Sequence, residues 1–164
     1  MSVSTALNQA EKQFARGGAV VRSLVSDGGE DWVATIPGEC VRVRVPGTSV
    51  GGQYSIVESL ALPMTGTPLH THREDEVFHI LEGTLTFDVA GERFEAGPGM
   101  LVVAPRGVPH AWRNFGDKPT RSMVVFTPGG IETLFPQLAN LPPPQVAELA
   151  ARYGSVVVGP PIER

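Results

Sequence analysis

The chain has 164 residues, of which 41% are hydrophobic, and its formal net charge is −4. This length and composition predict one globular domain with a core of its own and argue against a collagen-like or disordered chain. The acidic balance gives no basic field to attract a phosphate backbone or an anionic lipid, so we expect neither nucleic acid nor a membrane as a partner.

Glycine and proline are unusually frequent, with 19 glycines and 15 prolines, or roughly one residue in five. This frequency indicates many turns. No stretch approaches the roughly 20 apolar residues that span a bilayer, and the N-terminus has no basic segment followed by an apolar run. A single cysteine, Cys40, cannot form an internal disulfide. We therefore expect a cytoplasmic protein.

Residues 1–36 are expected to form an N-terminal arm. A weak helical pattern in Leu7, Ala10 and Phe14 ends at Gly17, and residues 19–25 form a strand-like apolar run. Such a strand could cover the sheet edge of a second copy, and we expect a homodimer.

Residues 37–130 contain short apolar or alternating runs at spacings near ten residues, separated by glycine and proline. No helical pattern of 10 to 15 residues lies between them, so the spacing predicts an all-β sandwich or barrel rather than βαβ units. After residue 130 the apolar period changes to about 3.6, which predicts two short amphipathic helices in a C-terminal extension, residues 131–164. The first has Ile131 and Leu138 on its apolar face, and the second has Val146 and Tyr153.

All four histidines lie between positions 70 and 110. Side chains alternate along a strand, so His70 and His72 share one face, while Glu76 opens the next strand with Phe78 on its own face and His79 on the other. Two imidazoles and a carboxylate suit divalent Fe, Mn, Ni, Co, Cu or Zn. His-X-His alone is a weak indication of a metal site, and the surrounding glycines and prolines strengthen it. His110 would be a fourth ligand if its strand lies alongside.

Two segments around these residues resemble the two motifs of the cupin superfamily. Residues 66–83 carry a glycine, His-X-His, a glutamate and a final glycine, although Gly66 lies three residues before His70 rather than the usual five. Residues 99–114, from Gly99 to Asn114, match the second motif at every defined position. The resemblance covers about residues 37–130 and implies a jelly-roll barrel with a metal in its mouth, held by His70, His72, Glu76 and His110.

Four ligands leave one or two positions of a divalent metal for substrate or O2. Phe78 shares the face of Glu76 and Trp112 that of His110, which predicts an aromatic substrate pocket; Phe126 is a third candidate, for which a core role is the alternative. The chain looks most like bacterial quercetinase-type dioxygenases. That resemblance implies a dioxygenase for a small enolic or aromatic compound, flavonol- or polyketide-like, with Glu76 as ligand and acid or base.

Two other functions stay open, because one fold supports many chemistries. The first is a non-redox metal enzyme, an isomerase, cyclase or decarboxylase of a small keto or enol metabolite. The second is a cupin that binds a small molecule without turnover. Glu58 interrupts an apolar row and is either a buried functional acid or part of an outward face. Arg106 and Arg113 flank His110 and either attract an anionic substrate or are solvated.

Overall fold

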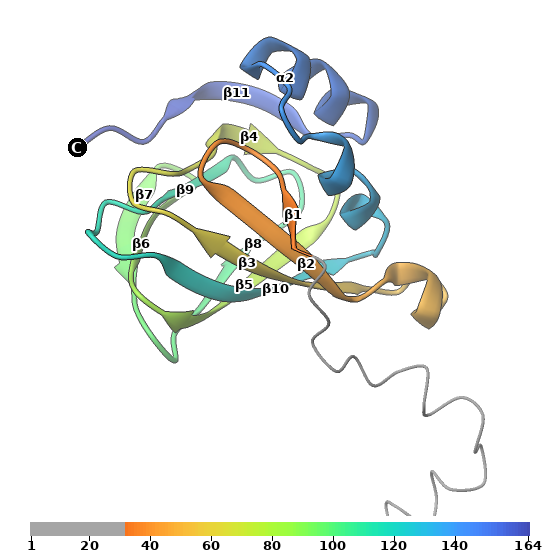
Figure 1. Cartoon of the computed structure of the whole chain (residues 1–164), viewed down its shortest axis with the longest axis horizontal. Helices are drawn as coiled ribbons and strands as arrows, with labels where there is room; N and C mark the ends of the chain where they lie inside the picture. The colour runs from red at the N-terminus through yellow and green to blue at the C-terminus, as the bar shows by residue number, and fades with distance from the viewer. Residues whose placement is uncertain (1–31) are drawn as a thin grey trace, which may run out of the picture.

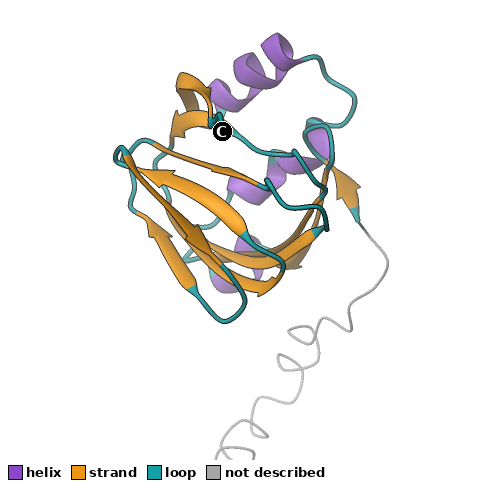
Figure 2. Cartoon of the chain, turned by 90° about the vertical axis from the view of Figure 1, so that its left-hand side faces the viewer, coloured by secondary structure: helices purple, strands orange, loops and turns teal. Residues whose placement is uncertain are grey.

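The computed structural model describes residues 32–164, which form two antiparallel sheets that pack face to face (Figures 1 and 2). The all-β prediction is therefore confirmed. The expected helix and strand of the N-terminal arm lie outside the described residues, and the homodimer that rests on them stays a prediction. None of the described helices is long and apolar enough to cross a membrane.

The six-stranded sheet has the order β1-β2-β3-β10-β5-β8. Its strands are β1 (Val33–Ala34), β2 (Glu39–Val45), β3 (Ser55–Ala61), β5 (Asp75–Glu82), β8 (Leu101–Ala104) and β10 (Thr120–Thr127). The five-stranded sheet has the order β11-β4-β9-β6-β7. Its strands are β4 (Pro68–Thr71), β6 (Leu85–Val89), β7 (Glu92–Ala96), β9 (His110–Arg113) and β11 (Val156–Pro161). A short 3-10 helix, Gly47–Val50, joins β2 to β3.

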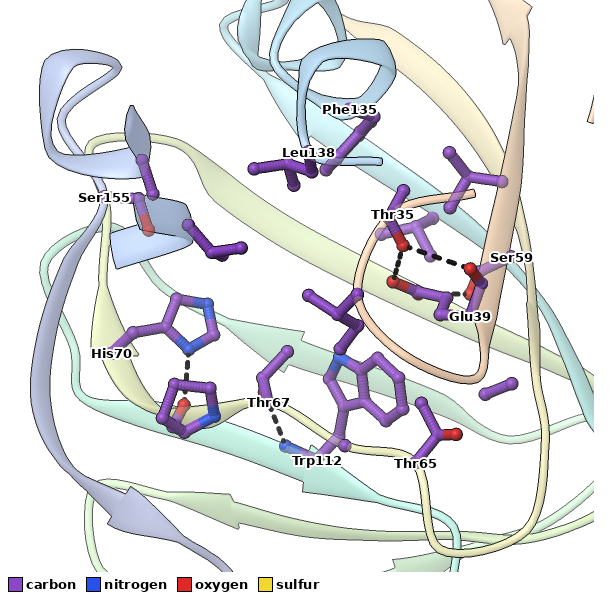
Figure 3. A pocket seen from close by; sticks show the side chains of 18 of the residues that line it. Thr35, Glu39, Ser59, Thr65, Thr67, His70, Trp112, Phe135, Leu138 and Ser155 are labelled. Atoms are coloured by element: carbon purple, nitrogen blue, oxygen red, sulfur yellow. Dashed lines mark hydrogen bonds between the residues drawn. The ribbon is translucent and has the colours of Figure 1, made fainter. Parts of the chain in front are cut away.

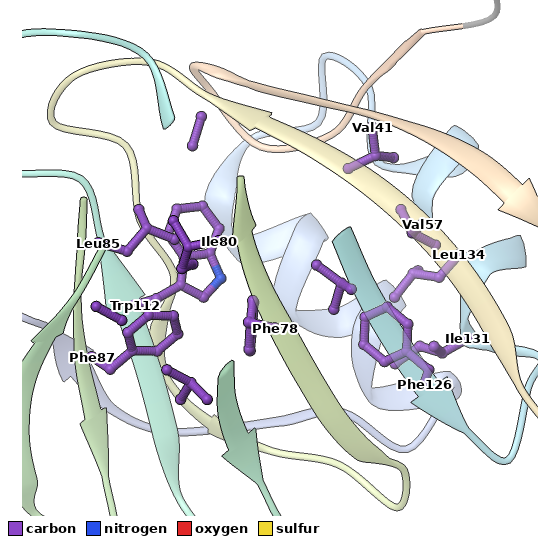
Figure 4. Close-up of a cluster of buried hydrophobic side chains, with 14 of the residues drawn as sticks. Val41, Val57, Phe78, Ile80, Leu85, Phe87, Trp112, Phe126, Ile131 and Leu134 are labelled. Carbon is purple, nitrogen blue, oxygen red and sulfur yellow. The ribbon is translucent and has the colours of Figure 1, made fainter. Parts of the chain in front are cut away.

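Strand alternation creates the core. In β10 buried and half-buried residues alternate without interruption, and in β5 Glu76, Phe78 and Ile80 are buried while His79 is exposed. This is the pattern of a sheet with one face against a second sheet. Aromatic and aliphatic side chains from both sheets meet in the interior (Figure 4). The predicted opposite directions of Glu76 and His79 are confirmed.

The turn between β5 and β6 depends on Gly83. Its φ is +75°, in the left-handed region that side chains rarely adopt, and a Cβ there would lie 2.9 Å from the Pro119 carbonyl oxygen. Only glycine meets both conditions without strain. The glycine that ends the first cupin-like motif thus lets the chain pass close to β10 and reverse between the two sheets.

The C-terminal extension contains the two expected helical segments and one strand that the sequence analysis missed. The first segment is a pair of 3-10 turns, Ile131–Thr133 and Phe135–Gln137, and the second is the α-helix α2 (Pro143–Arg152). After α2 the chain forms β11, in which Val157 pairs with His70 of β4. Figure 1 shows α2 and β11 together beside β4, so this extension lies next to the strand that carries the first histidine.

Candidate metal centre

The four candidate ligands come from both sheets. His70 lies in β4, His72 follows one residue after β4, and His110 begins β9, all in or beside the five-stranded sheet. Glu76 lies in β5 of the six-stranded sheet. Antiparallel pairing sets His70 directly opposite His110. The strand alongside His70 that the fourth ligand required is therefore β9.

The ligand atoms converge. One nitrogen or carboxylate oxygen from each of His70, His72, Glu76 and His110 lies within 4.8 Å of the others. The Nε2 atoms of His72 and His110 are each 3.1 Å from the same oxygen, Oε2 of Glu76. The centroids of the His70 and His110 rings are 4.4 Å apart. The arrangement brings together all four residues that the sequence analysis selected.

Backbone carbonyls orient the three imidazole rings. In each histidine the Nδ1 atom is within 3.0 Å of the carbonyl oxygen of a residue two positions away, and the pairs are His70 with Pro68, His72 with Glu74 and His110 with Val108. A carbonyl oxygen only accepts, so each Nδ1 carries the hydrogen. In a neutral ring with its hydrogen on Nδ1, the Nε2 atom has a free lone pair and can bind a metal ion. Such contacts behind the ring are typical of metal-binding histidines.

The pKa shifts of His70 and Glu76 favour the metal-binding forms, a neutral imidazole and a carboxylate. Burial, aided by the charge on His110, lowers the pKa of His70 to about 4. For Glu76 burial raises the pKa, but hydrogen bonds from His110 and His72 outweigh it and lower the pKa to about 2. For His72 burial lowers the pKa, and the hydrogen bond and charge of Glu76 outweigh that and raise it. An ionised carboxylate beside imidazoles is the donor set that a divalent transition metal requires.

The loop before His110 is fastened to the other ligand segments. The Gly107 N–H donates to the His72 carbonyl oxygen over 2.7 Å. Arg106 binds Asp75, the residue before Glu76. Its backbone N–H donates to Oδ1 of Asp75 over 2.8 Å, and its Nη2 donates to Oδ2 over 2.6 Å. Arg106 therefore supports the site from outside and does not line the cavity.

A cavity of about 630 Å³ opens beside the ligands and is lined by His70, His72 and Glu76 (Figure 3). The three predicted pocket residues, Phe78, Trp112 and Phe126, all line it and are all buried. Phe126 also belongs to the hydrophobic core, as the alternative interpretation predicted, and its role in substrate binding stays a prediction. Leu134, Leu138 and further side chains of the C-terminal extension complete an apolar wall.

Arg113 and Glu58 take structural roles. Arg113 donates to the Ile162 carbonyl oxygen at 2.7 Å and does not line the cavity. Glu58 is 1% exposed and accepts hydrogen bonds from Arg42 at 2.7 Å and Arg121 at 2.5 Å. Burial raises its pKa, and these two arginines outweigh burial and lower it. Glu58 is buried as predicted in one of the two interpretations, but it pairs with arginines away from the cavity.

The sequence analysis missed an acidic residue of the cavity, Glu39. It begins β2 and lines the same cavity as the candidate ligands, together with Thr35 and Ser59. A signal was present, because Glu39 precedes Val41 by two residues in an alternating strand and so shares its inward face.

Two sheets that enclose a cavity with three histidines and one glutamate beside it define a jelly-roll barrel with a candidate metal site. Residues 61–126 match the family model described as the cupin domain. This stretch carries all four candidate ligands and is similar to the cupin domain.

Known proteins support this similarity at the level of the fold. An uncharacterized protein of Methanocaldococcus jannaschii is 30% identical over 77 residues, which are 46% of this chain and 62% of that protein. This chain thus spans less than two thirds of that relative. KdgF from Halomonas sp. has a TM-score of 0.58 and 18% identity over 66% of this chain and 94% of its own. The polyketide cyclase RemF from Streptomyces resistomycificus has a TM-score of 0.55 and 23% identity over 63% of this chain and 78% of its own.

Proposed function

We propose that the protein is a metal-dependent dioxygenase for a small enolic or aromatic compound, flavonol- or polyketide-like. The observation that carries the proposal is the position of three candidate ligands, His70, His72 and Glu76, in the wall of an apolar cavity of about 630 Å³. Cavities of this size with few polar groups are typical of small-molecule sites. The quercetinase-type resemblance of the sequence adds the oxygenase chemistry to this picture.

A divalent transition metal bound by His70, His72, Glu76 and His110 would supply a Lewis acid with open positions, which favours the ionised form of an enol. The side chains and backbone around the site would exclude water and hold the ligand atoms in place. Phe78, Trp112 and Phe126 exclude water and offer flat apolar surfaces to a ring. The backbone carbonyls behind the imidazoles keep the nitrogen atoms aimed at one point, so no side chain has to reorganise when substrate arrives.

Glu76 is the residue to which we assign the substrate proton. It is the carboxylate at the ligand site, and its Oε2 atom faces both His72 and His110. Burial raises the pKa of Glu76, and the imidazole hydrogen bonds outweigh burial. When the two Nε2 atoms hold a metal they cannot donate to the carboxylate, and the basicity of Glu76 then depends on burial, which raises it, and on the charge of the metal, which lowers it.

A second candidate function is a non-redox cyclase, isomerase or decarboxylase. One observation favours it: the cavity holds a second carboxyl, Glu39, whose pKa is raised by burial while that of Glu76 is lowered. Two carboxyls with pKa values displaced in opposite directions are a common arrangement for proton transfer. The name of the similar structure RemF, a polyketide cyclase, is consistent with this chemistry.

Oxygen dependence separates the two functions. The protein is loaded in turn with Fe(II), Mn(II), Co(II), Ni(II), Cu(II) or Zn(II) and mixed with the probe 3-hydroxyflavone, in air and without O2. A dioxygenase consumes about one O2 per flavonol, only in air, and His72→Ala abolishes the reaction while His79→Ala, which alters an exposed histidine on the other face of β5, does not. Turnover without O2 refutes the dioxygenase and supports the second candidate. Binding without turnover under every condition refutes both.

A further inference from the structure

A hydroxyl-lined carboxyl lies in the cavity apart from the metal ligands. The group, here called the Glu39 cluster, consists of Thr35, Glu39 and Ser59. The Thr35 Oγ1 lies 2.6 Å from Oε2 of Glu39, and the Ser59 Oγ lies 2.7 Å from Oε1. Figure 3 shows the cluster on one side of the Trp112 ring and His70 on the other. A compound that reaches both groups therefore passes the indole.

Glu39 is half-buried and differs in its partners from the four buried glutamates of the described residues. Glu58 pairs with arginines, Glu74 with Arg73, Glu76 with imidazoles, and Glu132 accepts from the Gly47 and Gly130 N–H groups at 2.7 and 2.6 Å. Within residues 32–164 Glu39 makes no ion pair, and the hydrogen bonds of its side chain come from two neutral hydroxyls. A carboxylate in apolar surroundings without a cation is costly, so the neutral acid is favoured.

The pKa of Glu39 is shifted in the direction that favours the neutral acid. Burial raises the pKa of Glu39; the hydroxyls of Thr35 and Ser59 lower it in part, and the negative charge of Glu76 raises it further. Burial, the largest of these causes, does not depend on what Glu76 binds. Glu39 is half-buried, and it lines the largely apolar cavity.

With Glu39 neutral, the cluster has one more O–H hydrogen than its internal hydrogen bonds use. Two hydroxyls and one carboxyl carry three O–H hydrogens, and the two short oxygen–oxygen contacts use one hydrogen each. The Thr35 and Ser59 hydroxyls donate in these two contacts, so the remaining hydrogen is that of the neutral Glu39 carboxyl. One donor is thus left for an oxygen atom in the cavity.

We propose that the Glu39 cluster is a second substrate contact, at which the neutral Glu39 carboxyl hydrogen-bonds an oxygen of the substrate remote from the metal ligands. The inference rests on the proposed function and narrows its substrate class. The substrate is an apolar ring compound with two separate oxygen functions, an enol for the ligand residues and a carbonyl or hydroxyl for Glu39. Compounds with the enol alone bind less tightly.

The test compares ligands that differ by one hydroxyl. Zinc-loaded protein, which is redox-inert, is titrated with 3-hydroxyflavone and with its derivatives bearing one further hydroxyl on either outer ring, and binding is followed by flavonol fluorescence. We expect at least one derivative to bind about threefold to tenfold more tightly than the parent, the range of one neutral hydrogen bond. Glu39→Leu should remove this advantage, so that the derivative and the parent bind with equal affinity, and Glu39→Gln, which keeps an N–H donor, should retain it.

Controls separate this inference from the proposed function. Binding of the parent flavonol that is lost in His72→Ala reports on the metal site alone. Ser122→Ala alters another polar residue of the same cavity and should leave the advantage intact. If no derivative gains affinity, or if Glu39→Leu weakens every ligand equally, the Glu39 cluster is not a substrate contact while the metal site stands. If no flavonol binds at all, both proposals fall.

A measurement without metal or substrate tests the neutral carboxyl directly. Infrared difference spectra between the wild-type protein and Glu39→Gln, recorded near pH 7 on metal-free samples, should show the carbonyl band of a protonated carboxyl that vanishes in the variant. A carboxylate band in its place overturns the inference, because an ionised Glu39 has no hydrogen to donate.

Discussion

Asn114, the last residue of the second cupin-like motif, is expected to be among the costliest positions to change. It is fully buried, and its Nδ2 donates to the carbonyl oxygens of Ala61 at 3.0 Å and Lys118 at 2.9 Å. Its Oδ1 accepts from the Gly116 N–H at 2.9 Å. One amide thus joins the end of β3 to the turn that follows β9, four residues after His110.

Asn114→Ala removes three hydrogen bonds at once. At about 1 kcal/mol each, the expected loss is about 3 kcal/mol in the free energy of unfolding. For a domain of this size that loss lowers the midpoint of thermal unfolding by about 6 to 12 °C. Urea unfolding followed by tryptophan fluorescence measures the loss. The slope of the free energy of unfolding against urea concentration should be the same in the variant as in the wild-type protein.

Asn114→Asp is the matched variant for this prediction. The aspartate keeps the size of the side chain and can still accept from Gly116, but it cannot donate to the two carbonyl oxygens and places a charge beside them. We expect it to cost at least as much as Asn114→Ala. A loss below about 1 kcal/mol for Asn114→Ala would refute the reasoning, because it would mean that water or a rearranged chain replaces all three bonds.

Two further predictions concern the metal and the ion pair between Arg106 and Asp75 beside it, here called the clamp. A divalent metal at about 100 times its dissociation constant should raise the free energy of unfolding by about 2.7 kcal/mol, measured by thermal or urea unfolding. His72→Ala should lose this gain; an equal gain in the variant contradicts the site. Asp75 has its pKa lowered to about 2 by Arg106. Because the folded pKa is the lower one, the stabilisation is present above about pH 4 and is lost as the pH falls toward 2. Arg106→Ala should raise the Asp75 pKa toward 3.8 in an NMR titration, and an unchanged pKa contradicts the clamp.

The candidate site was more predictable from the sequence than its surroundings. The reason is the separation along the chain of the residues that each prediction needs. His70, His72 and Glu76 follow from the two-residue period of strands and from a local motif. His110 needed only the second motif and a neighbouring strand. The first three residues lie close together in the sequence, where periodicity acts, and the resemblance to the second cupin motif supplied the fourth.

The surroundings depend on long-range pairing, which periodicity does not encode. Glu58 was left between two interpretations because Arg42 and Arg121 reach it only once β2 and β10 flank β3. Glu39 was missed because one residue decides which face a strand end belongs to. The strand β11 was missed because it is a short valine run with a glycine and prolines, and most of it is exposed.

Barrel closure and the candidate metal site are coupled, since Glu76 belongs to one sheet and the histidines to the other. Neither sheet alone presents a complete ligand set. Within the closed barrel the polar groups of the cavity differ in charge: Glu76 is ionised among imidazoles, and the Glu39 cluster, in our proposal, is neutral. An enolate gains more from a metal cation at the first than from a neutral hydrogen-bond donor at the second, so this difference would give a two-oxygen substrate a single favoured direction in the cavity.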